Sequence, residues 1–417
     1  MYGLLGKTLS HSYSQSIHEH LSPEMSYHLY ETDDVETFLQ LKSFRGLNVT
    51  MPYKKAVIPC LDYLDETAEK TGVVNTIVRK NDQLIGYNTD FLAARTLVKQ
   101  YFPGHECSVA IVGNGATKAS FKSALEDLGY EHIDVFARHP DTGEYPLRDA
   151  QGSYHVLVNT TPVGTFPDIE DSLSLDLEAF QNLSLCLDVI YNPLKTSLML
   201  DAETRGIQTK NGLEMLIRQA AASHELFTGK TINESDIESL FRTFYEKLLN
   251  IVLIGLPYAG KTHYARKLSR NLDKRFVDID QRIEAQQNIS IEHIFQTKGE
   301  AHFRSLERQH TIEVAKRHQQ LIATGGGVVL DEQVMRALKQ NGIIIFLDLD
   351  ETLIDPSNLE NRPLVKAVED LKLLKEQRQH LYKHHSDIAI RKDTWEEGVM
   401  IRRIEEALYA HIHNQWS

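Results

Sequence analysis

The stretch Asn250–Thr262, NIVLIGLPYAGKT, constrains the fold of this chain more than any other. It begins with a short apolar, β-branched run, which is typical of a buried parallel strand, and it continues directly into GLPYAGKT, a P-loop. Gly255 and Gly260 allow the loop backbone to approach a phosphate chain closely. Lys261 supplies a cation for the β- and γ-phosphates, and Thr262 supplies a hydroxyl for Mg²⁺. We therefore predict an α/β domain that binds a nucleotide.

The length and composition indicate a globular protein with more than one domain. At 417 residues the chain is too long for one ordinary core, and 41% hydrophobic and 25% charged residues are typical of soluble proteins. No apolar run approaches the roughly 18 residues of a membrane span, and a net charge of -13 argues against general nucleic-acid binding. The start, MYGLLGKTLSHS, lacks the features of a signal peptide, so we expect a cytoplasmic protein. Cys60, Cys107 and Cys186 have no metal or redox spacing and are expected to be reduced thiols.

The first 60 residues contain two clusters of polar side chains that follow short strand patterns. Residues 2–5 resemble a strand, and the next loop carries Ser12 and Ser14 at the entrance of a helix that we expect to begin near residue 14 or 16. These hydroxyls could cap the helix or bind a polyhydroxylated ligand. In RGLNVTMPYKK, residues 45–55, a strand ends at Pro52 and Lys54 follows.

Four motifs in order resemble the shikimate dehydrogenases. They are GKTLSHSYS at 6–14, NVTMPYK at 48–54, VNT at 74–76 and NTD at 88–90. The resemblance implies a substrate site for the carboxylate and hydroxyls of shikimate, formed by Ser12, Ser14, Thr50, Asn75 and Asp90. It also implies that Lys54 lies beside Asp90 at the reacting oxygen.

The residue types suit the reduction of a ketone. Hydride addition leaves a developing alkoxide, which the Lys54 ammonium can stabilise and protonate. Asp90 would orient the lysine and accept a hydrogen bond from a substrate hydroxyl; the alternative is a purely structural Asp at the start of a helix. Two positions depart from the family pattern, with Gln15 replacing a proline and Phe91-Leu92-Ala93 replacing a glycine-containing turn.

A dinucleotide-binding pattern follows in the middle of the chain. A strand at 108–112, the turn GNGATKA, a helix to about residue 129 and a strand at 133–136 form a βαβ unit. Gly113, Gly115 and Ala116 lie in its turn. Arg138 follows the second strand, where an arginine pairs with a 2'-phosphate, so we expect NADP rather than NAD. The flanking Ala137 and His139 differ from the family's usual residues.

Further motifs of this half resemble the same family. Strands at 156–159 and 187–190 open into loops, which is where an open α/β sheet binds its ligands. The resemblance implies that Thr160 and Thr161 lie near the cofactor and that Tyr191 contacts the substrate. It also implies that Gly212 lies beside the nicotinamide and that Gln219 reaches the substrate. A helix is expected over residues 234–249, because its apolar residues have helical spacing.

The chain after the P-loop resembles the shikimate kinases. The motifs, in order, are FVDID at 276–280, GEAHFRSLE at 299–307, ATGGG at 323–327, NRPL at 361–364 and RQHLY at 378–382. We expect Asp278 and Asp280 at the end of a strand, pointing to opposite faces, so that one serves the metal and the other the acceptor hydroxyl. Tyr258 replaces a frequent glycine, and residues 350–360 lack an arginine often present in the lid.

The resemblance implies a role for each matching kinase residue. Asp278 and Thr262 would hold Mg²⁺, and Asp280 would bind the ring hydroxyls and accept a proton. Arg304 and Arg378 would clamp the substrate carboxylate, which fits a planar guanidinium. The backbone of Gly325, Gly326 and Gly327 would lie under the ring, and Arg362 would close over the phosphates from a lid.

We therefore predict a bifunctional enzyme that uses NADP(H), ATP and Mg²⁺, with 3-dehydroshikimate and shikimate as its substrates. The expected fold is α/β: a substrate domain at 1–90 and 211–249, a Rossmann domain at 91–210, and a P-loop domain, similar to nucleoside-monophosphate kinases, at 250–417. Two alternatives remain open. One is a quinate or polyol-acid dehydrogenase joined to another small-molecule kinase, and the other is a sensor in which one half only binds its ligand. The sequence gives no oligomeric state.

Overall fold

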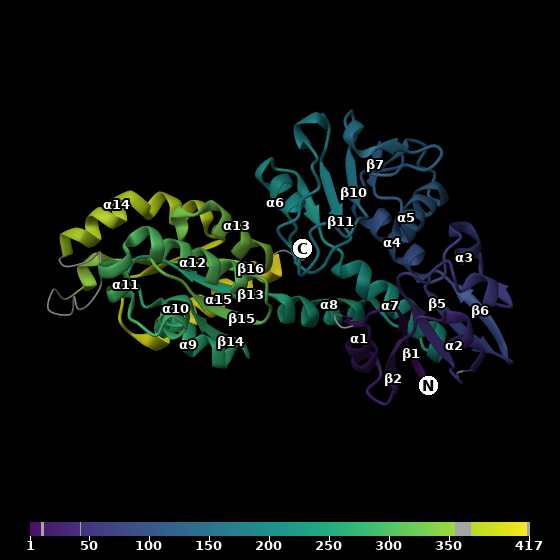
Figure 1. Cartoon of the computed structure of the whole chain (residues 1–417), viewed down its shortest axis with the longest axis horizontal. Coiled ribbons are helices and arrows are strands. Elements are labelled where there is room, and N and C mark those ends of the chain that lie inside the picture. The colour runs from purple at the N-terminus through teal and green to yellow at the C-terminus, as the bar shows by residue number, and fades with distance from the viewer. Residues whose placement is uncertain (10–11, 42, 355–367, 415–417) are drawn as a thin grey trace. The chain divides into compact units, whose positions relative to one another are not determined.

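The computed structural model describes residues 1–9, 12–41, 43–354 and 368–414. The chain forms two compact units (Figure 1). The first unit consists of Met1–Tyr191 and Thr196–Tyr245, and the second of Asn192–Lys195 and Glu246–Ser417. Both are built from helices packed on sheets, so the predicted α/β class is confirmed.

The first sheet of unit 1 is mixed and has six strands in the order β2-β1-β3-β5-β6-β4. Its strands are β1 (Tyr2–Gly6), β2 (Tyr27–Glu31), β3 (Gly46–Val49), β4 (Tyr63–Leu64), β5 (Thr76–Lys80) and β6 (Gln83–Tyr87). β1 pairs in parallel with β2 and β3, whereas β5 is antiparallel to both of its neighbours. Asn81 and Asp82 join β5 to β6 with positive φ at both positions, the backbone of a tight two-residue hairpin turn.

The second sheet of unit 1 is entirely parallel and has the order β12-β11-β10-β7-β8-β9. Its strands are β7 (Val109–Val112), β8 (Ile133–Ala137), β9 (Tyr145–Pro146), β10 (Val156–Asn159), β11 (Leu185–Asp188) and β12 (Gln208–Lys210). β7 and β10 are buried along their whole length, as expected for strands covered on both faces. The chain runs outward from β7 in one direction and from β10 in the other, so a topological switch point lies between these two strands.

Eight α-helices accompany the sheets of unit 1 in the described part of the chain (Figure 1). They are α1 (Ser14–Leu21), α2 (Val35–Leu41), α3 (Glu66–Thr71), α4 (Thr89–Tyr101), α5 (Ala116–Asp127), α6 (Ser197–Thr204), α7 (Leu213–Thr228) and α8 (Glu234–Leu248), the last of which continues into unit 2. The expected helix starts near residue 14, after residue 113 and at residue 234 are confirmed. Apolar side chains of α4 and α5 pack with β7 and β10 in one core of the parallel sheet.

Unit 2 contains a five-stranded parallel sheet in the order β14-β15-β13-β16-β17. The strands are β13 (Asn250–Ile254), β14 (Arg275–Asp278), β15 (Gln320–Ala323), β16 (Gly342–Leu349) and β17 (Ile388–Lys392). The helices are α9 (Lys261–Asn271), α10 (Ile279–Gln287), α11 (Ile291–Lys298), α12 (Glu300–Ala315), α13 (Glu332–Asn341), α14 (Val368–His385) and α15 (Glu397–Asn414). β13 is fully buried and leads through the predicted P-loop into α9, which confirms the strand-loop-helix context.

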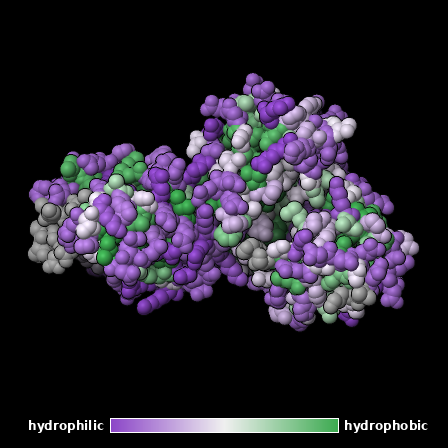
Figure 2. Space-filling view, in the orientation of Figure 1, coloured by the Kyte–Doolittle hydropathy of each residue, from purple (hydrophilic) through white to green (hydrophobic). Residues whose placement is uncertain are grey.

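Apolar residues are concentrated in the cores. On the face seen in Figure 2 most surface residues are hydrophilic, and apolar residues appear only in small separate patches. No helix in the described ranges is long and apolar enough to cross a lipid bilayer. Cys60, Cys107 and Cys186 are all free, as expected, and the last two are buried.

Candidate active sites

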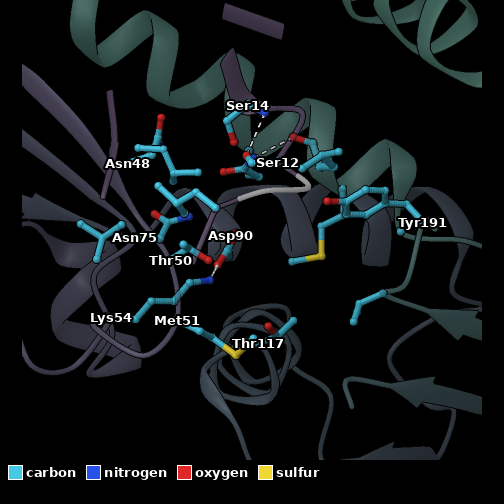
Figure 3. A pocket seen from close by; sticks show the side chains of 18 of the residues that line it. Ser12, Ser14, Asn48, Thr50, Met51, Lys54, Asn75, Asp90, Thr117 and Tyr191 are labelled. Carbon is cyan, nitrogen blue, oxygen red and sulfur yellow. Dashed lines mark hydrogen bonds and ion pairs between the residues drawn. The ribbon is translucent and has the colours of Figure 1, made fainter. Parts of the chain in front are cut away.

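A cavity of about 470 Å³ lies in unit 1, lined by the loops after β1 and β3 on one side and by residues after β11 and on α7 on the other. It brings together all the residues that the sequence predicted for the substrate of this half (Figure 3). They are Ser12, Ser14, Thr50, Lys54, Asn75, Asp90, Tyr191 and Gln219, with Gly212 beside them. Residues separated by up to about 200 positions in the sequence therefore line one cavity.

An ion pair between Lys54 and Asp90 lies in the wall of this cavity (Figure 3). Lys54 Nζ and Asp90 Oδ2 are 2.6 Å apart, and their side chains are only 15% and 10% exposed. Asn88, rather than Asp90, caps α4, because the Asn88 side chain accepts the N–H of Phe91. The Asp90 carboxylate is therefore not needed to begin the helix and instead holds the ammonium of Lys54.

Ser12, Ser14 and Thr50 supply hydroxyls to the cavity from the ends of two neighbouring strands. The N–H of Ser14 donates to Ser12 Oγ at 3.2 Å, which leaves the Ser12 hydroxyl proton available to a ligand. Thr50 follows β3 directly, and its N–H donates to the Leu5 carbonyl at 2.9 Å. Backbone bonds of the sheet thus fix the positions of these hydroxyls.

The amide of Asn75 has its orientation set by the backbone. The N–H of Thr89 donates to Asn75 Oδ1 at 2.7 Å, so the oxygen of the amide must lie on that side. Asn75 Nδ2 donates one hydrogen to Thr89 Oγ1 at 3.0 Å. The second hydrogen is available to a ligand in the cavity that Asn75 lines.

A buried hydrogen-bond chain continues from Asn75 to two histidines. Asn75 Oδ1 can only accept, so the Thr76 hydroxyl donates its proton to that oxygen at 3.1 Å. Thr76 Oγ1 in turn accepts a hydrogen bond from Asn48 Nδ2 at 3.2 Å. Asn48 Oδ1 then accepts from His18 Nε2 at 3.1 Å. With His18 neutral, its Nδ1 accepts from His224 Nδ1 at 3.1 Å.

His18 and His224 are both neutral in the folded protein at pH 7. Burial, followed by repulsion from His224, lowers the pKa of His18 to about 3. Burial also lowers the pKa of His224. A proton added to His18 Nδ1 would place its N–H against the N–H of His224 at the 3.1 Å contact. This series of hydrogen bonds therefore requires one tautomer of each histidine. The proton of His18 lies on Nε2, and that of His224 lies on Nδ1.

The loops after β7 and β10 meet at the switch point of the parallel sheet, where a dinucleotide is expected to bind. Gly113 has φ +111°, and a Cβ there would lie 2.6 Å from Thr160 Oγ1. The Thr160 hydroxyl donates to the Val112 carbonyl at 2.8 Å, and that of Thr161 to Asn159 Oδ1, also at 2.8 Å. Gly115 caps α5 and Ala116 is its first residue. The structure thus brings together five of the residues predicted for NADP.

Gly212 and Arg138 are the other residues predicted for NADP. A Cβ on Gly212 would lie 1.8 Å from the Val189 carbonyl oxygen, so no other residue fits without moving the backbone. Arg138 directly follows β8 and is exposed. The Asn114 side chain donates to the His139 carbonyl at 2.8 Å and so ties the glycine turn to the segment that carries Arg138.

Tyr191 and Gln219 close the cavity on the side of α7. Burial raises the pKa of Tyr191 to about 12, so its hydroxyl remains protonated and can donate to a ligand. The Tyr191 ring packs edge-on against Tyr13 with centroids 5.9 Å apart. Gln219 Nε2 donates to the Leu216 carbonyl at 2.8 Å, which orients the amide of Gln219.

The P-loop of unit 2 has the arrangement expected for a phosphate site. Lys261 Nζ donates to the carbonyls of Gly255 and Leu256, both at 2.9 Å, so the ammonium lies against the loop. Gly260 has φ +84° and precedes α9. The Thr262 hydroxyl donates to Asp278 Oδ2 at 2.6 Å, which places the two predicted magnesium ligands together.

The expected strand geometry of Asp278 and Asp280 is wrong. β14 ends at Asp278, whose side chain accepts the N–H of Gln281 and caps α10, and Asp280 lies in the first turn of that helix. Residues two positions apart in a strand would share a face. The two carboxylates instead separate because the chain changes from strand to helix between them.

Asp280 lies near the glycine run after β15 and near an ion pair on α12. A Cβ on Gly325 would come within 2.2 Å of Glu307 Oε1 and 3.2 Å of Asp280 Oδ1. Arg304 Nη1 donates to Glu307 Oε2 at 2.6 Å, and a Cβ on Gly327 would lie 2.2 Å from Arg304 Nη1. A side chain at either glycine would therefore displace the end of the Glu307 or Arg304 side chain and disturb this ion pair.

Arg378 is the last of the described residues that were predicted to bind the kinase substrate. It is buried, and its Nη1 donates to the Gly326 carbonyl at 3.1 Å. The structure thus groups Asp280, Arg304, Gly325 to Gly327 and Arg378. The predicted Arg362 lies outside the described residues.

Sequence reasoning missed several residues of these sites. Asn48, Met51, Thr117 and Met215 also line the cavity of unit 1. Glu307 stands three residues after Arg304 on one helix, a spacing that could have identified the pair. Burial, with a smaller contribution from Asp280, raises the pKa of Glu307 in spite of Arg304.

Three family models match the chain. The shikimate dehydrogenase substrate binding domain matches residues 4–77, the shikimate 5'-dehydrogenase C-terminal domain matches residues 212–239, and shikimate kinase matches residues 257–409.

Known proteins are similar to a large part of the chain. The shikimate dehydrogenase (NADP(+)) of Bacillus licheniformis is 34% identical over 266 residues, which are 58% of this chain and 95% of that protein. The structure of shikimate 5-dehydrogenase from Thermus thermophilus in complex with NADP(H) and shikimate has a TM-score of 0.52 and 29% identity, covering 58% of this chain and 98% of that one. The structure of a chorismate mutase/shikimate 5-dehydrogenase fusion protein from Clostridium acetobutylicum has a TM-score of 0.53 and 31% identity. The match covers 59% of this chain and 97% of that one.

The stability of unit 1 should fall as the pH drops below about 6.5. In the unfolded chain both histidines take up protons near their ordinary pKa, whereas folded His18 stays neutral down to about pH 3. The contribution of His18 is therefore complete above pH 6.5 and is lost toward pH 3, at roughly 1.4 kcal/mol per pH unit, and His224 adds a loss in the same direction. Hydrogen-exchange protection of α1 and α7 at pH 7 and pH 5 measures this loss.

Two variants control that measurement. His18→Leu should reduce the pH dependence, because one of the two groups is gone. His20→Leu removes an exposed histidine from the same helix and should leave it unchanged. A His18→Leu protein with the full wild-type dependence would contradict the assignment.

Proposed function

We propose that this chain, which belongs to the shikimate dehydrogenase family and also carries a shikimate kinase domain, catalyses two reactions of the shikimate pathway. The first is reduction of 3-dehydroshikimate to shikimate with NADPH, and the second is phosphorylation of shikimate to shikimate 3-phosphate with ATP and Mg²⁺. One observation carries this conclusion. Two separate sets of matches meet at one metabolite, because the product of the first reaction is the acceptor in the second.

In the dehydrogenase half, the cavity of unit 1 holds 3-dehydroshikimate. Hydroxyls of Ser12, Ser14 and Thr50, with the amide of Asn75, bind its carboxylate and hydroxyls. Tyr191 and Gln219 contact it from the opposite wall. This assignment is supported by their common position around the cavity.

Lys54 and Asp90 carry the acid-base chemistry. Bound NADPH supplies a hydride to the ketone carbon. The carbonyl oxygen gains negative charge as this happens, and the Lys54 ammonium stabilises that charge and gives the oxygen its proton. Asp90 holds the Lys54 ammonium directed at the oxygen, which the 2.6 Å contact between them supports.

The dinucleotide fits the loops at the switch point of the parallel sheet. The turn of Gly113, Gly115 and Ala116 lies at the N-terminus of α5, which favours a pyrophosphate. Thr160, Thr161 and Gly212 form the walls beside it. Arg138 pairs with the 2'-phosphate, and its exposed position at the end of β8 supports that role.

In the kinase half, the P-loop holds ATP and Mg²⁺. Gly255, Gly260 and Lys261 bind the phosphate chain, and Thr262 with Asp278 holds the metal. The 2.6 Å contact between these two side chains fits a magnesium site, because both offer oxygen ligands at one point. Bound Mg²⁺ neutralises charge on the phosphates, and Arg362 from the lid would add to this.

The acceptor is shikimate, bound over the glycine run after β15. Arg304 and Arg378 hold its carboxylate, and the backbone of Gly325, Gly326 and Gly327 supports the ring. Asp280 accepts the proton of the attacking hydroxyl. The buried Glu307 holds Arg304 in place, which its 2.6 Å ion pair supports.

Mass spectrometry of the products tests the whole proposal. Purified protein is incubated with 3-dehydroshikimate, NADPH, ATP and Mg²⁺, and shikimate 3-phosphate is expected. Shikimate alone would leave the kinase half without its acceptor, and no product would support a sensor. The alternative of a quinate dehydrogenase is not favoured, because the relatives are shikimate dehydrogenases; kinetics with both acids decides it.

We retain the domain limits 1–90 with 211–249, 91–210, and 250–417 as proposed boundaries. We also propose a cytoplasmic location, supported by three free cysteines, which are typical of reducing compartments. Nucleic acid and membranes are not proposed as partners.

Two single substitutions should separate the activities. Lys54→Ala removes the proton donor and should lower the reduction rate by roughly 100-fold or more while leaving phosphorylation unchanged. Lys261→Ala should lower phosphorylation by a similar factor and spare reduction. Steady-state assays of both reactions on each variant measure this. If either change silenced both activities in a folded protein, the assignment of separate sites would be wrong.

The preference for NADPH should depend on Arg138. Arg138→Ala removes a charge-assisted hydrogen bond and should raise the KM for NADPH by roughly tenfold to 100-fold, with little effect on the KM for NADH. Arg148→Ala, which changes another exposed arginine of unit 1, is the matched control. An equal effect on both nucleotides would rule out contact with the 2'-phosphate.

A further inference from the structure

A second lysine lies against the P-loop of unit 2. Lys392 is the last residue of β17 and is fully buried, 131 positions after Lys261 in the sequence. Its Nζ donates to the Ala259 carbonyl of the P-loop at 3.2 Å. It also lies 3.1 Å from where a Cβ on Gly260 would be. No P-loop pattern contains this residue, and no motif in the sequence points to it.

Among the residues that the structure describes, the ammonium of Lys392 has no carboxylate partner. Within the described part of the chain no Asp or Glu oxygen forms an ion pair with it, and its neighbours are aromatic rings. Nζ lies 3.7 Å from the centroid of Trp395 and 5.3 Å from that of Tyr264. Ring faces stabilise a cation only in part. A buried positive charge without a counter-ion is unfavourable, so the free protein retains it at a cost.

The positive charges around this loop add together. Lys261 Nζ holds the carbonyls of Gly255 and Leu256, and Lys392 Nζ holds that of Ala259. The N-terminus of α9, which carries a partial positive charge, begins at the same place. An anion bound inside the loop would be the counter-ion of all three.

We propose that Lys392 is a positioning residue for the nucleotide of the kinase half: its ammonium fixes the Ala259 carbonyl, and its charge is compensated by the phosphates of ATP. This inference rests on the proposed function of the P-loop. It assigns to β17 a part in nucleotide binding, and it explains a buried lysine that hydrogen bonds alone would not require. Trp395 and Tyr264 keep the ammonium at the loop in the absence of ligand.

The ionisation of Lys392 agrees with this role. Burial lowers the pKa of Lys392 to about 8. Tyr264 on α9 contacts it, Glu397 on α15 acts on Tyr264, and Lys261 donates to the Gly255 and Leu256 carbonyls of the same loop. Bound phosphates would favour the charged form, so affinity for ATP should be greatest below pH 8 and should fall as the pH rises to 9.

Isothermal titration of Mg-ATP into the full-length protein tests the proposal. Lys392→Met keeps the apolar stem and removes the charge, and it should weaken binding about tenfold, which is about 1.4 kcal/mol. Lys392→Gln can keep a hydrogen bond to Ala259 without the charge and should lie between Lys392→Met and wild type. The wild-type affinity should fall between pH 7 and pH 9, and that of Lys392→Met should not.

Lys267→Met is the matched control. Lys267 also lies in unit 2, on α9, the helix that follows the P-loop. Its side chain is half-exposed, and its Nζ lies 3.3 Å from a Glu397 oxygen. Its loss should leave ATP binding within about twofold of wild type. Wild-type affinity in a folded Lys392→Met protein, or equal losses in both variants, would overturn the proposal.

Two measurements keep the outcomes separate. If Lys392→Met does not fold, the wild-type pH dependence decides, and an affinity that stays constant from pH 7 to pH 9 would reject the role of Lys392. If the wild-type protein binds Mg-ATP but does not phosphorylate shikimate, the proposed function fails, while the binding data still decide the role of Lys392. Dehydrogenase activity in the same samples reports the amount of active protein.

Discussion

The hydrogen bonding of parallel strands is the constraint on which both sites depend. Parallel ladders align the carboxyl ends of their strands at one edge, and the loops that leave that edge must carry the ligands. The loops after β7 and β10 meet at the switch point of one sheet. In unit 2, the P-loop follows β13, the glycine run follows β15, and Asp278 ends β14. Residues distant in sequence become neighbours because the register of each sheet is fixed along its whole length.

Within that frame, buried charges and dipoles give the sites their chemistry. The charges of Lys54 and Asp90 compensate one another at 2.6 Å, and both side chains are mostly buried in the wall of the cavity. His18 and His224 are buried behind Asn48, which lines the same cavity, and they remain neutral and serve as directional hydrogen-bond groups. Lys392 also has no carboxylate partner in the described ranges, and we infer that its counter-ion is a ligand. The three cases differ in their neighbours: Lys54 faces a carboxylate, the histidines face each other and neutral polar groups, and Lys392 faces a carbonyl and two aromatic rings.

The site of unit 1 was largely predictable, because short motifs name residues that each lie at the end of an element. Lys54 and Asp90 were assigned together from two motifs 36 positions apart, and the structure joins them. The strand geometry expected for Asp278 and Asp280 failed, because β14 ends at Asp278, which caps the next helix, two residues earlier than the pattern suggested. Glu307 was missed although its spacing from Arg304 is local, and Lys392 was missed because its contact with the P-loop joins segments more than 100 positions apart. Arg362 remains a prediction from the sequence.

The sequence by itself determined the classes of element, the two nucleotide-binding turns and the residue types that face phosphate, because glycine, lysine and hydroxyl spacing near a strand end is a local property. Only the tertiary structure decided which distant groups meet. It set the polarity of the hydrogen bonds from Thr89 to His224, and it required glycine at position 212 because the Val189 carbonyl lies there. It also placed Lys392 against the P-loop. These outcomes depend on packing between elements, which sequence spacing does not specify.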